Sequence, residues 1–208
     1  MSEPTLVDEP RGTTDLLDVI YRRRAVRAYT PDPIDERRLR APLDAAVHAP
    51  TAIHQEPWQF VVVQNRTLLK RISDRAKELA RVHTAHHGPL LKRPGGAADK
   101  VFSPLADPEF NIFYDAGTLV VICARPTNEF VAADCWLAAE NFMLSACADA
   151  LGTCCIGFAM PVLNTPEMKA ELGIPADVHA FAPIIVGVPR GEVHPVPRKP
   201  PVVLNWLR

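Results

Sequence analysis

The sequence has no apolar run that approaches the roughly 20 residues needed to cross a bilayer. It also lacks the basic start and apolar stretch of a secretory signal, because residues 1–12 are acidic and polar. We therefore expect no membrane-spanning helix and a cytoplasmic location.

Neither sign of charge is in excess: 23 Lys and Arg residues stand against 24 Asp and Glu residues, and the formal net charge is -1. This balance gives no support for binding to a nucleic-acid backbone. No glycine-rich fingerprint follows any predicted strand, which excludes a Rossmann dinucleotide site and a P-loop.

The five cysteines are an odd number, and four of them fall in segments that have the pattern of helix or strand interiors. Cysteine at such positions is commonly a small buried apolar residue, and disulfides are rare in the cytosol, so we expect no disulfide scaffold. His83, His86 and His87 raise the alternative of a metal site. No partnered cysteine lies near them, so we interpret them as solvated loop residues and predict no metal.

The chain does have the composition of an ordinary folded domain, with 48% hydrophobic and 23% charged residues. Its 208 residues fit one domain. We expect residues 1–13 to form a flexible arm and residues 14–208 a single domain. Within that domain the polar segment 84–111 is predicted to be a lid-like insertion, since loops of this length are functional, partner-facing or disordered.

Periodicity and capping residues predict the secondary structure. Helices are expected at 15–23, 35–48 (with Asp35 as N-cap), 68–83, 130–151 and 166–172, and strands at 58–63, 118–123, 154–158 and 181–188. This order is not simple βαβ alternation, and it predicts an α+β protein with three layers.

Two segments carry more specific expectations. The helix at 130–151 is apolar around most of its circumference, which is typical of a helix central to a core or to a subunit interface, and Gly152 is expected to end it. The proline-rich segment 189–201 cannot form a packed element alone and is expected to lie along another part of the protein, with Trp206 packing on a partner subunit.

Four arginines, Arg22, Arg23, Arg24 and Arg27, fall within six residues. Like charges this close repel each other unless an anion or acidic side chains neutralise them. The planar guanidinium suits phosphate and other oxyanions. A solvated helix end, where cations meet the negative end of the helix dipole, remains an equal alternative on this segment alone.

Five motifs follow one another along the chain. They are Arg23-Arg24-Ala25-Val26-Arg27-Ala28-Tyr29, the Ala-Pro-Thr…Pro-Trp segment 49–58, Asn-Ile-Phe-Tyr-Asp-Ala at 111–116, the helix and turn at 139–154, and the tail pieces at 172–175, 183–187 and 198–200. In order and spacing they resemble the nitroreductase family of FMN-dependent oxidoreductases. The resemblance covers nearly the whole chain after residue 14.

The resemblance implies an interlocked homodimer with a central mixed, mostly antiparallel sheet flanked by helices, and FMN bound between the subunits. It also implies cofactor-binding roles for particular positions. Arg23 and Arg198 match family positions that contact the phosphate, and Arg24 and Ala25 lie in the same motif as Arg23. Arg27 matches the position beside flavin N1 and the C2 carbonyl. The ribityl and dimethylbenzene side is matched by Pro50, Thr51 and Ala52, and the approach to flavin N5 by Cys155, Ile156 and Gly157.

The chain departs from the family pattern at four positions. Ala25 stands where the family has serine, His54 where it has asparagine, and Glu56 and Glu140 where it has glutamine. His54 is cofactor-lining by position and is the candidate catalytic residue, as a donor of a proton or hydrogen bond to the substrate. A satisfied polar residue in the loop is the alternative interpretation of His54.

The resemblance implies ping-pong chemistry, in which hydride from NADH or NADPH passes through flavin N5 to a small electron-poor acceptor such as a nitroaromatic or a quinone. Two alternatives stay open. One is a specialised branch of the family, dehalogenase-like or flavin-fragmenting, and the other is a flavin-binding or sequestering protein with little turnover.

Overall fold

The computed structural model describes residues 15–30, 32, 34–87, 107–194 and 196–208. The expected arm at 1–13 and residues 88–106 of the expected insertion lie outside the described residues. No helix in the described part of the chain is long and apolar enough to cross a membrane.

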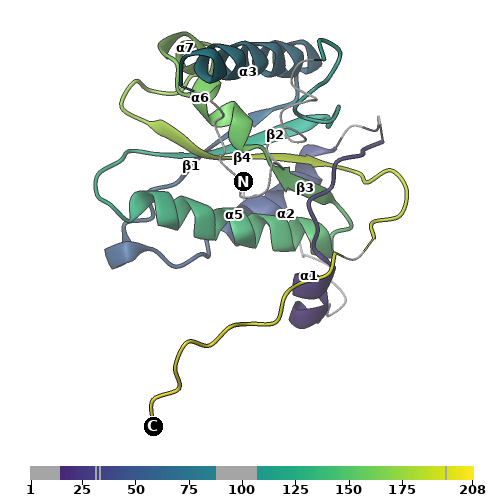
Figure 1. Ribbon diagram of the computed structural model, residues 1–208, viewed down its shortest axis with the longest axis vertical. Coiled ribbons are helices and arrows are strands. Elements are labelled where there is room, and N and C mark those ends of the chain that lie inside the picture. The colour runs from purple at the N-terminus through teal and green to yellow at the C-terminus, as the bar shows by residue number, and fades with distance from the viewer. Residues whose placement is uncertain (1–14, 31, 33, 88–106, 195) are drawn as a thin grey trace, which may run out of the picture.

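Within the described residues a four-stranded antiparallel sheet forms the middle layer (Figure 1). The strands follow the spatial order β1 (Gln59–Val63), β2 (Thr118–Ala124), β4 (His179–Gly187) and β3 (Gly152–Cys155). All seven residues of β2 are buried, as its nearly continuous apolar run predicts for a strand covered on both faces. Its side chains alternate between the faces, so that Leu119 and Val121 join one core cluster and Val120 and Ile122 the other.

Helices cover both faces of this sheet, which gives the predicted three-layer α+β architecture. On one face lie α3 (Arg66–His87), α6 (Met160–Leu163) and α7 (Pro166–Leu172), and on the other lie α2 (Glu36–Ala46) and α5 (Val131–Ala148) (Figure 1). Helix α1 (Leu16–Arg22) stands near the C-terminal end of α5, where Cys147 Sγ is 4.0 Å from the Val19 carbonyl oxygen. The expected N-cap is confirmed, because the Asp35 carboxylate accepts a hydrogen bond from the Arg37 amide at 2.8 Å.

An extended segment after α1 lines the edge of the sheet beside β3. Ala25 forms a parallel bridge with Thr153, and the Val26 N–H donates to the Thr153 carbonyl at 2.9 Å. Farther along, Tyr29 forms an antiparallel bridge with Pro189 at the end of β4. The parallel bridge makes the pairing mixed but mostly antiparallel, as expected.

Several element boundaries differ from the sequence-based expectations, most clearly at the third strand and at the ends of α5 and α3. The third strand of the chain covers 152–155 and not 154–158, and residues 157–159 form a short 3-10 helix. Gly152 does not end α5; Ala150 leaves the helix with φ 56°, and Gly152 opens β3. A Cβ on Gly152 would lie 2.8 Å from the Val26 side chain, so the absence of a side chain at Gly152 lets the Val26 segment pack against β3. Helix α3 continues to His87, so residues 84–87 are helical and not part of a loop.

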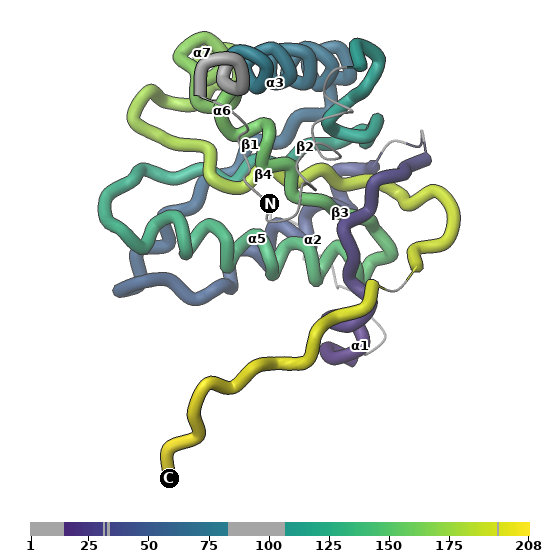
Figure 2. Tube along the Cα trace, viewed as in Figure 1, coloured from purple at the N-terminus to yellow at the C-terminus, as the bar shows by residue number. Residues whose placement is uncertain are grey.

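The chain after β4 leaves the globular body as an extended tail without helix or strand in its described residues (Figure 2). Leu204 and Leu207 are 96% and 86% exposed, and Trp206 is also exposed. On α1, Val19 is buried but Leu16 and Leu17 are exposed, so part of the apolar surface of this helix is likewise uncovered.

Candidate functional site

The arginine-bearing segment places two guanidinium groups on one side of an extended strand. Val26 is buried, whereas its neighbours Ala25 and Arg27 are exposed. Because side chains alternate along an extended chain, Arg23, Ala25 and Arg27 share the outward face. Arg23 Nε lies 3.2 Å from Glu140 Oε1 on α5, so one of the family departures pairs directly with this arginine.

Arg24 has a different role. Its Nη1 donates to the carbonyl oxygens of Tyr21 and of Arg23, the latter at 2.7 Å, at the C-terminal end of α1. This is the helix-end neutralisation that the sequence left open, and it applies to Arg24. Its Nε is buried and has no hydrogen-bond partner among the described residues, so one donor of this guanidinium remains unsatisfied.

Arg27 is held beside an aromatic ring that sequence reasoning missed. Its Cζ lies 5.9 Å from the centroid of the Tyr114 ring, within the range of a cation–π contact. Tyr114 has φ 52°, a left-handed conformation, and its ring meets Phe110 edge-on with centroids 5.6 Å apart. The turn just before β2 therefore orients the Arg27 guanidinium.

The segment 155–157 lies next to the arginines, because β3 leads directly into it. Cys155 Sγ is 3.6 Å from Met143 Sδ, and burial raises the pKa of the Cys155 thiol to about 11, so it is neutral at ordinary pH. Ile156 is buried, and its N–H donates to the Pro183 carbonyl at 2.9 Å. Gly157 is exposed at the start of a 3-10 helix (Gly157–Ala159), and a Cβ there would meet no atom within 4 Å.

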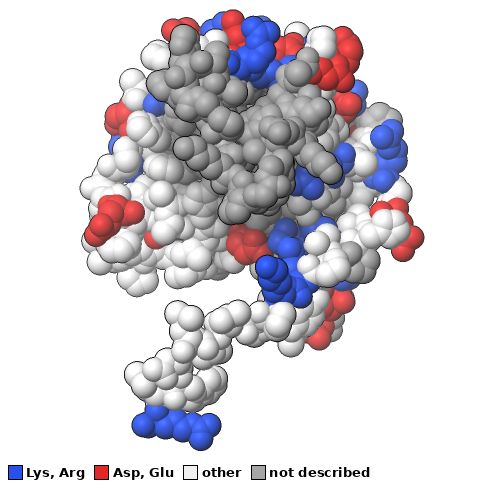
Figure 3. All heavy atoms as spheres, in the orientation of Figure 1, with Lys and Arg blue, Asp and Glu red and all other residues white. Residues whose placement is uncertain are grey.

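The Ala25–Thr153 bridge thus sets the arginine segment beside β3, which leads through Cys155 and Ile156 to Gly157. Lys and Arg side chains gather on this side of the molecule, near the point where the tail leaves the body (Figure 3). Cations on this side, together with an open backbone at Gly157, suit a planar, anionic ligand.

The loop with Pro50, Thr51, Ala52 and His54 is built from strained backbone. Ile53, His54 and Glu56 have φ of 48°, 53° and 45°, and each left-handed non-glycine residue costs about 1–2 kcal/mol. Such strain persists where neighbouring contacts impose it, and it is common at functional sites. Pro50 and His54 are exposed, and Thr51 and Ala52 are half-buried.

Three hydrogen bonds from the α5 side hold this loop, the longest of them from Thr127 Oγ1 to Gln55 Oε1 at 3.4 Å. The Ala52 N–H, in the 3-10 helix η1 (Ala52–His54), donates to Asp134 Oδ1 at 3.2 Å. Asn128 Nδ2 donates to Gln55 Oε1 at 2.7 Å. The loop therefore belongs to the N-terminal end of α5.

This anchoring separates the predicted site residues into two groups within one chain. Asp134, which holds the loop, and Met143, which contacts Cys155, are nine residues apart, or about 14 Å along the axis of α5. Figure 1 shows the loop and the arginine segment at opposite ends of this helix. Arg198 joins neither group, because it is exposed on the tail and makes no hydrogen bond or ion pair with the described residues.

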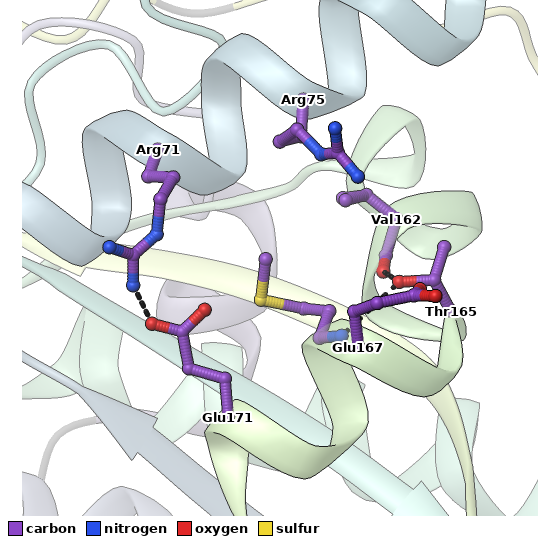
Figure 4. Close-up of a pocket in the computed structure, with 7 residues that line it drawn as sticks. Arg71, Arg75, Val162, Thr165, Glu167 and Glu171 are labelled. Atoms are coloured by element: carbon purple, nitrogen blue, oxygen red, sulfur yellow. Dashed lines mark hydrogen bonds and ion pairs between the residues drawn. The ribbon is translucent and has the colours of Figure 1, made fainter.

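A hollow on the other helical layer does not serve this site. It lies between α3 and α7 and is lined by Arg71, Arg75, Val162, Thr165, Glu167, Met168 and Glu171, none of them a predicted site residue (Figure 4). Arg71 and Glu171 form an ion pair across it. In the part of the chain with described side chains, no three His, Cys, Asp or Glu residues lie together as a metal site; the side chains of His83, His86 and His87 lie outside that part.

The comparison with known families decides the assignment. The sequence pattern of the Nitroreductase family matches residues 20–188. The chain belongs to the nitroreductase family. Its long central helix, its arginine segment and the turn after β3 are therefore elements of a nitroreductase fold.

Individual proteins resemble this nitroreductase-family chain over most of its length. A protein of Archaeoglobus fulgidus named as an NADH dehydrogenase/NAD(P)H nitroreductase is 26% identical over 183 residues, covering 86% of this chain and 87% of its own. A nitroreductase from Bacteroides fragilis, solved with bound FMN, superposes with TM-score 0.74 at 25% identity, covering 94% of this chain and 100% of its own. Iodotyrosine deiodinase, solved with FMN and 3-iodo-L-tyrosine, shares the fold with TM-score 0.71 at 18% identity, covering 93% and 100%.

Proposed function

We propose that this nitroreductase-family protein is an FMN-dependent oxidoreductase that uses NADH or NADPH to reduce a small electron-poor acceptor. The observation that carries the proposal is the pairing of the segment that bears Arg23 and Arg27 with β3, the strand that leads into the open backbone at Gly157. The FMN bound to the Bacteroides fragilis relative, and the nicotinamide in the name of the Archaeoglobus fulgidus relative, support it.

The residues present fit FMN by their chemistry. Arg23 supplies a charge-assisted donor for the phosphate, and Arg198 supplies a second one from the tail. The exposed Arg27 guanidinium supplies positive charge where a reduced flavin gains negative charge. Gly157 leaves free the space that a Cβ would fill.

Bound FMN would supply the hydride acceptor and donor at N5, in a ping-pong exchange between nicotinamide and acceptor. The chain's own part is to bind and orient. Arg27, oriented by its contact with Tyr114, would stabilise negative charge on the bound flavin ring. Gly157 would leave the approach to flavin N5 open, because it has no side chain there. His54 is exposed on its loop, where its imidazole is free to donate a proton or hydrogen bond to a bound acceptor.

We infer a homodimer in which each site takes residues from both chains. One chain holds the arginine segment and the Pro50–His54 loop at opposite ends of α5, so a second copy would complete each site. The exposed apolar side chains support this, since they need a partner surface. They include Leu16, Leu17, Tyr21, Trp136, Leu137, Leu204, Trp206 and Leu207.

An absorbance spectrum of the purified protein, followed by anaerobic addition of NADH and then NADPH, tests the function. We expect a flavin spectrum that bleaches on addition of at least one nicotinamide, and FMN released by heat. A colourless protein that takes up no added FMN would contradict the proposal.

A flavin-binding protein with little turnover is the second candidate, because Ala25, His54 and Glu56 depart from the family pattern at cofactor-lining positions. It predicts full FMN occupancy and slow reduction by both nicotinamides. The likeness to iodotyrosine deiodinase is one of fold, and acceptor screening with halogenated and nitro-substituted phenols distinguishes a dehalogenase-like branch from a nitroreductase.

A further inference from the structure

Asp134 is a buried acid in an otherwise apolar stretch of α5. It is 3% exposed and lies in the first turn of the helix, between alanine and cysteine. Its Oδ1 accepts the hydrogen bond from the Ala52 N–H, whereas its Oδ2 is buried without a hydrogen-bond partner among the described residues. A carboxylate buried at this cost requires a reason beyond packing.

The loop above Asp134 supplies that reason. Ile53, His54 and Glu56 are all left-handed, and Ile53 is β-branched and 83% exposed, so no core contact of its side chain compensates for the strain. The loop must be held by tethers to its backbone and polar side chains. Asp134 accepts a hydrogen bond from the loop at Ala52, just before Ile53. Asn128 donates a hydrogen bond to the loop at Gln55, just after His54.

We propose that Asp134 is a positioning residue, which holds the 51–56 loop in its strained conformation so that its Thr51, Ala52 and His54 are presented to the flavin and the acceptor. This inference rests on the proposed function for its consequence, FMN binding. The tether itself is a property of the protein without cofactor.

The competing role is that of a helix-capping charge, because an acid in the first turn of α5 interacts favourably with the helix dipole. Two variants separate the roles. Asp134→Asn loses the charge but keeps a carbonyl acceptor for the Ala52 N–H. Asp134→Ala loses both, and Asp134→Leu serves in its place if the alanine variant does not fold.

The readouts are hydrogen–deuterium exchange of residues 49–58 in the cofactor-free protein and the FMN dissociation constant from flavin fluorescence. In Asp134→Ala we expect faster exchange confined to the loop and FMN binding weakened by about tenfold, the effect of one lost hydrogen bond with its strained segment. Asp134→Asn is expected to stay near the wild type in both, and Asp44→Ala, an exposed acid on α2, serves as the control.

A double variant tests whether Asp134 affects FMN binding by holding the strained backbone of the loop. Ile53→Gly removes the steric cost of the left-handed conformation, so Asp134→Ala combined with Ile53→Gly is expected to recover most of the lost FMN affinity. Unchanged loop exchange in Asp134→Ala, or an Asp134→Asn variant as defective as Asp134→Ala, would overturn the inference. A wild-type protein that binds no FMN would overturn the proposed function, while the exchange data would still decide whether Asp134 holds the loop.

Discussion

At the scale of single residues, Arg23 has a carboxylate neighbour that competes with any anionic ligand. Glu140 lies 3.2 Å from its Nε, and both side chains are partly exposed, so the pair is weak. Replacing Glu140 by Gln restores the family residue and is expected to tighten FMN binding about two- to fivefold, because the guanidinium is released. Fluorescence titration with FMN measures the change.

Removing the positive charge of Arg23 is expected to weaken FMN binding, the opposite of the Glu140→Gln effect. Arg23→Gln loses a charge-assisted hydrogen bond to phosphate and is expected to weaken FMN binding at least about tenfold. Arg40→Gln removes the cation of a similar ion pair with Glu36 on α2 and serves as the control for a general charge effect. Equal FMN affinities in Arg23→Gln and the wild type would remove Arg23 from the site.

The buried thiols make a prediction about pH. Burial raises the pKa of Cys155 to about 11 and those of Cys123 and Cys135 to about 12, whereas an unfolded cysteine titrates near about 8.5. Between these values the folded protein holds more protons than the unfolded one, so stability is full below about pH 8.5 and falls as pH rises toward 12. Urea unfolding from pH 7 to 11 measures this.

A cysteine variant isolates the contribution of one thiol. Cys135→Ala is expected to unfold with a shallower dependence on pH above 9 than the wild type, whatever its stability at pH 7, because one titrating group with a raised pKa has been removed. Parallel curves for the two proteins would contradict the assigned shift.

At the scale of elements, two glycines that look alike in sequence have different neighbours. A Cβ on Gly187, at the end of β4, would lie 2.5 Å from Tyr29 Cδ1, whereas one on Gly157 would meet nothing within 4 Å. Gly187→Ala is expected to destabilise the fold by about 1–3 kcal/mol, since the buried ring or the edge segment must shift. Gly157→Ala is expected to leave the stability of the cofactor-free protein unchanged and to weaken FMN binding.

Urea denaturation and FMN titration of both glycine variants check this crossed pattern. Loss of stability in Gly157→Ala with intact FMN affinity would place that glycine in the fold and not in the site.

The elements also show where local sequence signals suffice. The cap at Asp35 and the helix 166–172 agree with the sequence because capping residues and periodicity act within a few residues. Gly152 was misread as a helix stop because its neighbour Val26 lies 126 positions earlier in the chain. No local pattern reports such a contact.

At the scale of the whole molecule, the exposed tail predicts an assembly. It carries the exposed side chains of Leu204, Trp206 and Leu207 away from the body of the chain (Figure 2). Exposing these apolar side chains to water is unfavourable unless a second copy of the chain covers them. Truncation after Arg190 is expected to convert a dimer into monomers or a weak dimer, as measured by light scattering coupled to size-exclusion chromatography. FMN affinity is expected to fall with it, because Arg198 is lost.

Trp206→Ala is a milder version of the same change, and Val196→Ala, nearer the start of the tail, is its control. A wild-type monomer, or a truncated chain that remains a tight dimer, would contradict the assembly and require each site to be completed within one chain.

The candidate site was predictable where a motif lies on one continuous stretch. Arg23, Arg27 and Gly157 could be chosen from sequence, and the Ala25–Thr153 bridge pairs the arginine segment with the strand that precedes Gly157. Tyr114 and Asp134 were not chosen. The one signal for Asp134 was an acid inside an apolar helix. Tyr114 lay in the motif at 111–116, but nothing local indicated its contact with Arg27, because that contact arises from a left-handed turn facing a segment 87 residues earlier.

The sequence by itself determined the family, the α+β layering and the positions of most helices and strands, because periodicity, caps and ordered motifs are written locally. Only the tertiary structure decided that Arg24 bonds to a helix end while Arg23 and Arg27 share the outward face of a segment beside β3. It also decided that Asp134 accepts a hydrogen bond from a strained loop, and that the two groups of site residues lie at opposite ends of α5. These facts depend on which distant segments touch, and chain folding alone creates those contacts.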